Sequence, residues 1–116
     1  MSRIDINVDP ITWGEDLRLE YRGELFSGEA VEMLGDQLLS QEFYVNGIRH
    51  GPSRKWWADG RMMSEGEMIA GNPSGVFRKW HPNGRVAEEV HFDDNGMLVA
   101  RYRSDERQGG ACLLRN

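Results

Sequence analysis

The sequence has few of the residues that usually carry chemistry. It contains a single cysteine, Cys112, so no disulfide can form within the chain, and a reducing compartment is its natural setting. The three histidines and Cys112 follow no metal-binding spacing. A phosphate-binding glycine loop and a nucleophile motif are both absent. We therefore expect no enzyme: no catalytic residue, no metal site and no cofactor site.

Long hydrophobic runs and helical periodicity are also missing. No apolar stretch approaches the roughly 18 residues that a membrane span needs. Residues 1–10 lack the basic-then-apolar order of a signal peptide. The 4 prolines are few, whereas the 14 glycines recur at intervals that would break most helices. These features predict a soluble, cytoplasmic protein built from strands.

Basic residues are in deficit. Lys and Arg together number 14 against 19 Asp and Glu, a net charge of −5, which argues against nucleic acid and anionic membranes as partners. Residues 1–47 hold 10 acidic and 3 basic residues, a net charge of −7. This segment is either a solvated surface or a docking face for a basic partner. The acidic candidates for contact are Glu20, Glu24, Glu29, Glu32 and Asp36. We expect an alternate subset, with Glu20, Arg22 and Glu24 in line, to dominate.

What the sequence does have is an internal repeat. Ser40–Arg61 is matched by Ser64–Arg85, with Gly47 aligned to Gly71 and Gly51 to Gly75. The fixed period, about 24 residues, indicates stacked supersecondary units, each unable to bury its own apolar face. The preceding unit is degenerate and one residue shorter around Gly35.

Turn signals divide the repeats into strands. Asn-Gly or Asp-Gly dipeptides, typical of hairpin turns, end at Gly47, Gly60, Gly84 and Gly96. Runs of strand length separate them: Gln41–Val45, Ser53–Trp57, Met62–Met68, Val76–Trp80, Arg85–Phe92 and Met97–Tyr102. Ile4, Ile6 and Val8 predict one further strand with a buried face. The fold class is therefore all-β, an antiparallel β-hairpin meander forming an elongated, twisted sheet.

The organisation follows from these units. We expect a single domain over residues 1–116, with a strand or cap in 1–18, repeats of about 24 residues in 19–103 and a C-terminal cap in 104–116. Terminal units of an array are expected to be atypical because they cap it.

Tryptophans recur with the repeat and suggest a stripe across the sheet. Trp56 and Trp80 align, with Arg54 and Arg78 two residues before them on the same face. We expect the tryptophans to lie two strands, roughly 10 Å, apart, with each arginine over an indole. The stripe is either the core seam of the repeat or an exposed groove that contacts a partner.

These motifs resemble a known family. Tyr44–Gly51, followed by Arg54–Arg61 and then Glu65, is similar to the variant MORN (membrane occupation and recognition nexus) repeat, and Leu25–Ala30 looks like an opening unit. The resemblance covers residues 19–103. Two features depart from the family pattern: Trp replaces Tyr at positions 56, 57 and 80, and the first unit is short.

Small proteins of this kind resemble the YwqK-type antitoxins, immunity proteins of bacterial polymorphic toxin systems. The resemblance implies a cytosolic protein that neutralises a toxin by occluding its active site or substrate surface. The acidic charge favours a protein toxin with a basic surface, such as a nuclease, and we expect a monomer or weak homo-oligomer. The alternative is a scaffold or self-assembling interaction module, because exposed sheet edges pair readily. Lipid binding, which the repeat's name suggests, is opposed by the net charge of −5.

Overall fold

The protein is an all-β structure of two sheets, seen here in a computed structural model that describes residues 2–104 and the backbone of 111–114. The small sheet contains β2 (Ile11–Trp13), β3 (Leu19–Tyr21) and β4 (Glu24–Leu25). The strands of the large sheet are β1 (Ser2–Asp5), β5 (Gly28–Leu34), β6 (Gln37–Val45), β7 (Ile48–Trp56), β8 (Met62–Ile69), β9 (Asn72–Trp80), β10 (Val86–Phe92), β11 (Leu98–Ser104) and β12 (Ala111–Leu114). The described part of the chain contains no helix, and therefore no helix able to span a membrane.

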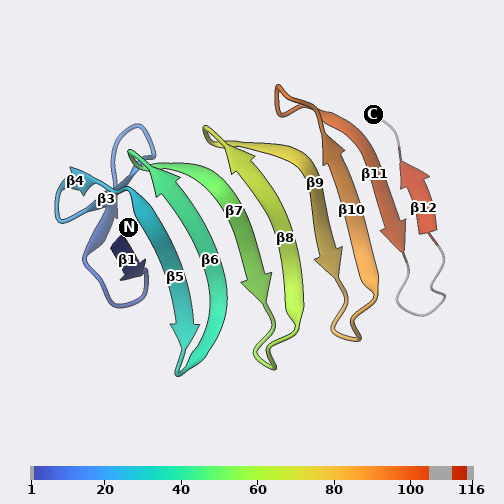
Figure 1. The fold of residues 1–116 in the computed structure, drawn as a ribbon, viewed down its shortest axis with the longest axis horizontal. Coiled ribbons are helices and arrows are strands. Elements are labelled where there is room, and N and C mark those ends of the chain that lie inside the picture. The colour runs from blue at the N-terminus through green and yellow to red at the C-terminus, as the bar shows by residue number, and fades with distance from the viewer. Residues whose placement is uncertain (1, 105–110, 115–116) are drawn as a thin grey trace.

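The large sheet is the meander that the turn spacing predicts. From β5 to β12 each strand pairs antiparallel with the next one in sequence, so the ribbon advances in one direction across the molecule (Figure 1). The molecule measures 48 × 35 × 22 Å, and the strands succeed one another along its longest axis. One pairing departs from the expectation: β1 lies beside β5 in parallel, which makes the sheet mixed.

The hairpins of the large sheet use two lengths of turn. Asn46-Gly47 and Ala70-Gly71 are two-residue loops with positive φ at both positions, the type I′ geometry that suits twisted strands. The Gly60, Gly84 and Gly96 turns are longer. In each, three residues are enclosed by a backbone hydrogen bond, such as that from Trp57 N to Arg61 O at 2.7 Å. The shorter loop at Gly35-Asp36 accounts for the missing residue of the first unit.

Bulges recur with the same period as the sequence repeat. Leu39, Met63 and Ala87 are each skipped in the pairing of their strand with the preceding one. A bulge lets two neighbouring side chains oppose one residue of the partner strand and bends the strand. Because the three bulges are in register, their side chains gather along the same part of the sheet.

The buried core lies at the N-terminal end, not along the tryptophans. Ile4, Leu19, Phe26, Ala30 and Tyr44 form one cluster between the small sheet and the first strands of the large sheet. The Phe26 ring contacts the rings of Tyr21 and Tyr44, with centroids 6.2 and 6.4 Å apart. Farther along the sheet, the only buried hydrophobic residue among those described is Val90. The small sheet therefore covers one end of the large sheet and leaves the rest open.

The expected strand with Ile4, Ile6 and Val8 on one buried face is wrong beyond Asp5. Val8 is 78% exposed. The chain turns because the Asp5 carboxylate accepts from the Asn7 amide, and the Asp9 carboxylate accepts from the Asp5 amide. Such local side-chain bonds compete with pairing in a sheet.

Candidate binding groove

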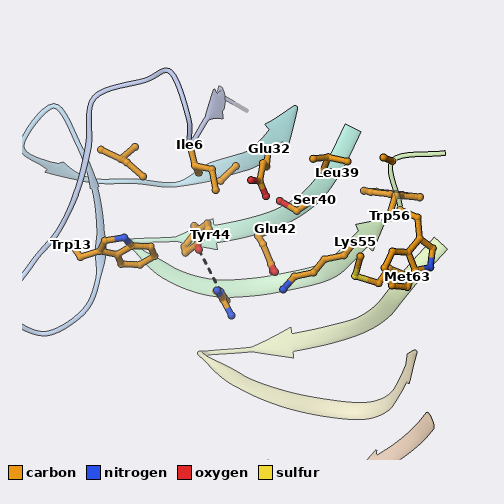
Figure 2. Close-up of a pocket in the computed structure, with 15 residues that line it drawn as sticks. Ile6, Trp13, Glu32, Leu39, Ser40, Glu42, Tyr44, Lys55, Trp56 and Met63 are labelled. Atoms are coloured by element: carbon orange, nitrogen blue, oxygen red, sulfur yellow. Dashed lines mark hydrogen bonds between the residues drawn. The ribbon is translucent and has the colours of Figure 1, made fainter. Parts of the chain in front are cut away.

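Two adjoining cavities lie on one face of the large sheet and share Lys55, Trp57 and Met63. Their volumes are about 530 and 400 Å³. We call this continuous surface the groove. The aromatic residues that line it are Trp13, Tyr44, Trp56, Trp57 and Trp80. Figure 2 shows the larger cavity, in which the side chains of Glu42 and Lys55 lie between Trp13 at one end and Trp56 at the other.

A substitution within the repeat puts a carboxylate in the lining of the larger cavity. We number the complete units from Ser40–Arg61, leaving out the short unit before it. In the second of them, Ser64–Arg85, the Phe77 ring covers Gly66 so closely that an added Cβ would collide with it. The equivalent positions of the preceding unit carry Ser53 and Glu42. Serine is too small to fill the volume that the phenylalanine ring occupies. In the first of these units the Glu42 carboxylate, which accepts a hydrogen bond from Ser53 Oγ, therefore replaces the contact between Gly66 and the Phe77 ring.

Glu42 is the buried charge of the groove. Its side chain is only 9% exposed, and its Oε1 accepts a hydrogen bond from Ser53 Oγ at 2.9 Å. Its Oε2 is buried and accepts no hydrogen bond from any described residue. An unpartnered buried carboxylate oxygen costs more than an unpaired neutral group. The corresponding residue of the third unit is Val90, so this position is apolar elsewhere in the array.

The cations around Glu42 leave that oxygen free. Arg49 Nε donates to the Tyr44 hydroxyl at 3.4 Å. This hydrogen bond, opposed by desolvation, raises the pKa of Arg49, and the charges of Tyr44 and Glu42 raise it further. Lys55 is exposed and forms no ion pair with any described residue. The groove thus holds charges of both signs that are incompletely matched.

Trp57 supplies a second unmatched group. Its indole Nε1 is buried and has no acceptor among the described residues. At the equivalent position of the next unit, His81 Nε2 lies 3.1 Å from the Ser104 carbonyl oxygen. The larger cavity is therefore lined by a free acceptor at Glu42 and a free donor at Trp57.

The opposite face carries a row of paired charges. Gln41, Arg54, Glu65, Arg78 and Glu89 are consecutive Cα partners across five strands. Arg54 Nε lies 2.9 Å from the Glu65 carboxylate, and Arg78 Nε lies 3.0 Å from that of Glu89. The hydrogen bond from Arg78, followed by that from His91, lowers the pKa of Glu89.

These ion pairs correct the expectation for the two arginines. Arg54 and Arg78 do not stack over the indoles of Trp56 and Trp80. The only cation–π contact in the described part of the chain joins Arg22 and Tyr21. A guanidinium with a carboxylate directly opposite it gains a charge-assisted hydrogen bond that an indole cannot offer. The two arginines therefore belong to the face opposite the groove.

Trp56 and Trp80 occupy the places that the repeat predicts, on β7 and β9 with β8 between them. Both are half-buried, and each lines one of the two cavities. The core-seam interpretation does not fit, because the buried cluster lies at the other end of the sheet. The groove interpretation is the one the geometry favours.

The acidic candidates are not gathered on one face. Glu32 lines the groove, whereas Glu29 pairs with Arg3 at 3.1 Å. Asp36 is exposed in the β5–β6 turn. The expected line of Glu20, Arg22 and Glu24 is wrong. Because the chain turns at Arg22, Glu24 stands opposite Tyr21, and the two glutamates point to different faces of the small sheet.

Residues that the sequence analysis did not select dominate the groove. Trp13, Glu42, Tyr44 and Trp57 all line the larger cavity. Glu42 had a detectable signal, because aligning the repeats places it with Gly66 and Val90. Trp13 was hidden, since it enters from the small sheet, outside the aligned units.

The described residues contain no cluster of three or more His, Cys, Asp or Glu side chains able to hold a metal ion. Cys112 has a side chain outside the described part of the structure. In comparisons with known proteins, no protein-family model and no curated protein sequence matches the chain.

Proposed function

We propose that this protein neutralises a protein toxin by binding a segment of it in the groove. The observation that carries the proposal is the larger cavity, which is lined by four aromatic residues and by Glu42, whose buried Oε2 has no partner among the described residues. Aromatic residues in a concave site with a few placed polar groups are typical of binding surfaces. The resemblance of the repeats to MORN-type immunity proteins supports a toxin as the partner.

The distribution of charge favours a basic partner. Residues 1–47 carry a net charge of −7 and include both the small sheet and Glu42. An acidic surface beside a binding groove accelerates encounter with a basic protein and disfavours other partners. Toxins that act on nucleic acids carry basic surfaces, so an acidic binding protein would compete with their substrate.

The test uses the product of the neighbouring reading frame as the candidate toxin. The purified wild-type chain should bind that product and suppress its toxicity when the two are co-expressed. The variant Glu42→Gly/Ser53→Phe, which copies the second repeat and replaces the buried carboxylate with a phenylalanine ring, should remain folded and fail to protect. Glu65→Gln, on the opposite face, is the matched control and should protect as the wild type does. Equal protection by Glu42→Gly/Ser53→Phe would contradict a groove-mediated mechanism.

A self-assembling scaffold is the second candidate function. Its specific support is the sheet itself, which is open at β1 and at β12. Unpaired strand edges are templates for pairing with another chain. Light scattering across a range of protein concentrations distinguishes the two proposals: a toxin-binding monomer keeps a constant mass, whereas a scaffold gains mass as concentration rises.

A further inference from the structure

We infer that the larger cavity is a pocket for one arginine side chain on a segment of the partner protein. The inference rests on the proposed function for the identity of the partner, but not for the chemistry of the pocket. Two of the residues that line the pocket carry a buried polar atom without a partner among the described residues, Oε2 of Glu42 and Nε1 of Trp57, and its walls are aromatic. An arginine residue supplies all the matching groups: a guanidinium donor, a main-chain carbonyl acceptor and a flat surface for stacking.

The buried carboxylate sets the charge of the occupant. Glu42 is more than nine-tenths buried, and Ser53 satisfies only its Oε1. Bringing a positive group against Oε2 converts an unpaired buried charge into a hydrogen-bonded ion pair. A neutral ligand could donate to the same oxygen, but it would leave the buried charge uncompensated. The occupant should therefore be cationic.

The aromatic walls select guanidinium over ammonium. Trp13, Tyr44 and Trp56 line the cavity with Glu42, and the rings of Trp13 and Tyr44 lie 6.4 Å apart in a tilted arrangement. A guanidinium is planar and weakly hydrated, so it stacks on aromatic rings more readily than an ammonium does. The cavity volume of about 530 Å³ accommodates an arginine side chain with its flanking main chain.

Lys55 is the internal competitor for Glu42. Both side chains line the cavity and come from the paired strands β6 and β7. Lys55 forms no ion pair with a described residue, and its flexible, exposed stem lets the ammonium move into solvent when another cation arrives. Removing the Lys55 charge should therefore strengthen the binding of arginine. Arg49 competes less, because its Nε is bonded to the Tyr44 hydroxyl.

The repeat explains why this pocket is in the first unit alone. The second unit has Gly66 in place of the carboxylate, and the Phe77 ring occupies the space above it. In the third unit the corresponding residue is the buried Val90. A structural repeat needs no charge at this position, so Glu42 departs from the pattern where the array otherwise buries apolar groups.

The test is an NMR titration of the ¹⁵N-labelled full chain with N-acetyl-arginine N-methylamide. Its citrulline analogue, which is nearly isosteric and uncharged, is the control ligand. The readout is the indole N–H signal of Trp57, assigned with Trp57→Phe. We expect saturable shifts with the arginine ligand and at least tenfold weaker binding of citrulline. Glu42→Gln should weaken arginine binding at least tenfold, and Lys55→Met should strengthen it. Glu65→Gln should bind as the wild type does.

Three outcomes overturn the inference: no saturable shift at Trp57, equal binding of arginine and citrulline, or wild-type affinity in Glu42→Gln. If Glu42→Gln does not fold, Glu42→Gly/Ser53→Phe takes its place, and the citrulline comparison needs no variant. The outcome is separable from the proposed function. If the protein binds arginine but does not bind the neighbouring gene's product, the proposed toxin partner is refuted and the arginine pocket stands. If the protein binds that product but does not bind arginine, the arginine pocket is refuted and the toxin partner stands.

Discussion

Arg78 on β9 lies directly opposite Glu89 on β10, with 3.0 Å between its Nε and the carboxylate. The same pair occurs one repeat earlier as Arg54 and Glu65. The repeat thus specifies side-chain partners as well as backbone turns. On the other face the same register gives the groove row of Ser40, Lys55, Ser64 and Lys79, where Lys79 lies 3.9 Å from the Glu88 carboxylate and Lys55 forms no ion pair with a described residue.

The Arg78–Glu89 pair predicts a specific acid sensitivity. Arg78, followed by His91, holds the pKa of Glu89 below its ordinary value of 4.5. A depressed carboxyl pKa stabilises the fold above the unfolded pKa, and this stabilisation is lost as the pH falls through the folded pKa. A ¹³C titration of the Glu89 carboxyl should give a midpoint below 4.5, which Arg78→Met should raise. An unchanged Glu89 midpoint in Arg78→Met would refute the pairing.

Leu17 is a strained residue whose replacement should stabilise the protein. It has a φ of 63° in a three-residue loop, at the position that Gly60 occupies in the equivalent loop of a later hairpin. A non-glycine residue in this region costs roughly 1–2 kcal/mol, and Leu17 is 78% exposed, so little packing is lost. Leu17→Gly should raise the free energy of unfolding in urea by about 1 kcal/mol, after the greater entropy of glycine in the unfolded chain is subtracted.

Val99→Gly is the control for that variant. Val99 is similarly exposed but lies within β11 without a positive φ. Glycine there should lower the free energy of unfolding by roughly 0.5–1 kcal/mol. Equal losses in the two variants would show that Leu17 is not strained.

Core and groove aromatics should respond differently to truncation. Phe26 is 4% exposed at the centre of the buried cluster, whereas Trp56 is half-buried beside the cavity. Phe26→Ala should lower the free energy of unfolding by about 3–5 kcal/mol. Trp56→Ala should lower the free energy of unfolding by less than half as much and weaken partner binding by more than tenfold. Urea denaturation and a binding titration on both variants check this, and a larger loss of stability in Trp56→Ala would place the core at the tryptophans instead.

The acidic N-terminal segment should act on the rate of association. Glu24 and Asp36 are exposed acids within the part of the chain that carries a net charge of −7. Glu24→Lys/Asp36→Lys should slow association at low ionic strength and leave dissociation nearly unchanged. The difference should fade toward about 1 M salt, where the screening length falls to about 3 Å. Asp94→Lys, an exposed site at the far end of the sheet, is the control. A flat salt response in the wild type would contradict electrostatic steering.

The sequence predicted the meander because its signals are local. Turn dipeptides such as Asn46-Gly47 need positive φ, and the alternation between turns sets the faces of each strand. The three-residue loops were predicted from the glycine at their third position. The equivalent loop that carries Leu17 at this position was therefore missed. The parallel β1–β5 pairing was also missed, because it joins segments whose pairing no turn dictates.

The candidate site was harder to predict because a cavity depends on which side chains do not fill the space above the sheet. The repeat located Trp56 and Trp80, but burial is decided by what packs above the sheet, and the small sheet covers only the N-terminal end. Glu42 stands out only when the repeats are aligned, because the equivalent positions carry Gly66 and Val90. The acidic residues misled the analysis because composition does not state which face a side chain occupies.

The central claim is that the groove face, not the opposite face, holds the partner. The most direct measurement is calorimetric titration of the neighbouring gene's product with two surface variants. Ser64→Tyr places a ring in the groove between Lys55 and Lys79, whereas Tyr102→Ser removes one from the opposite face. Thermal melting of each variant confirms folding first. The account predicts at least tenfold weaker binding for Ser64→Tyr and unchanged binding for Tyr102→Ser. The reverse pattern, in a folded pair of variants, would contradict it.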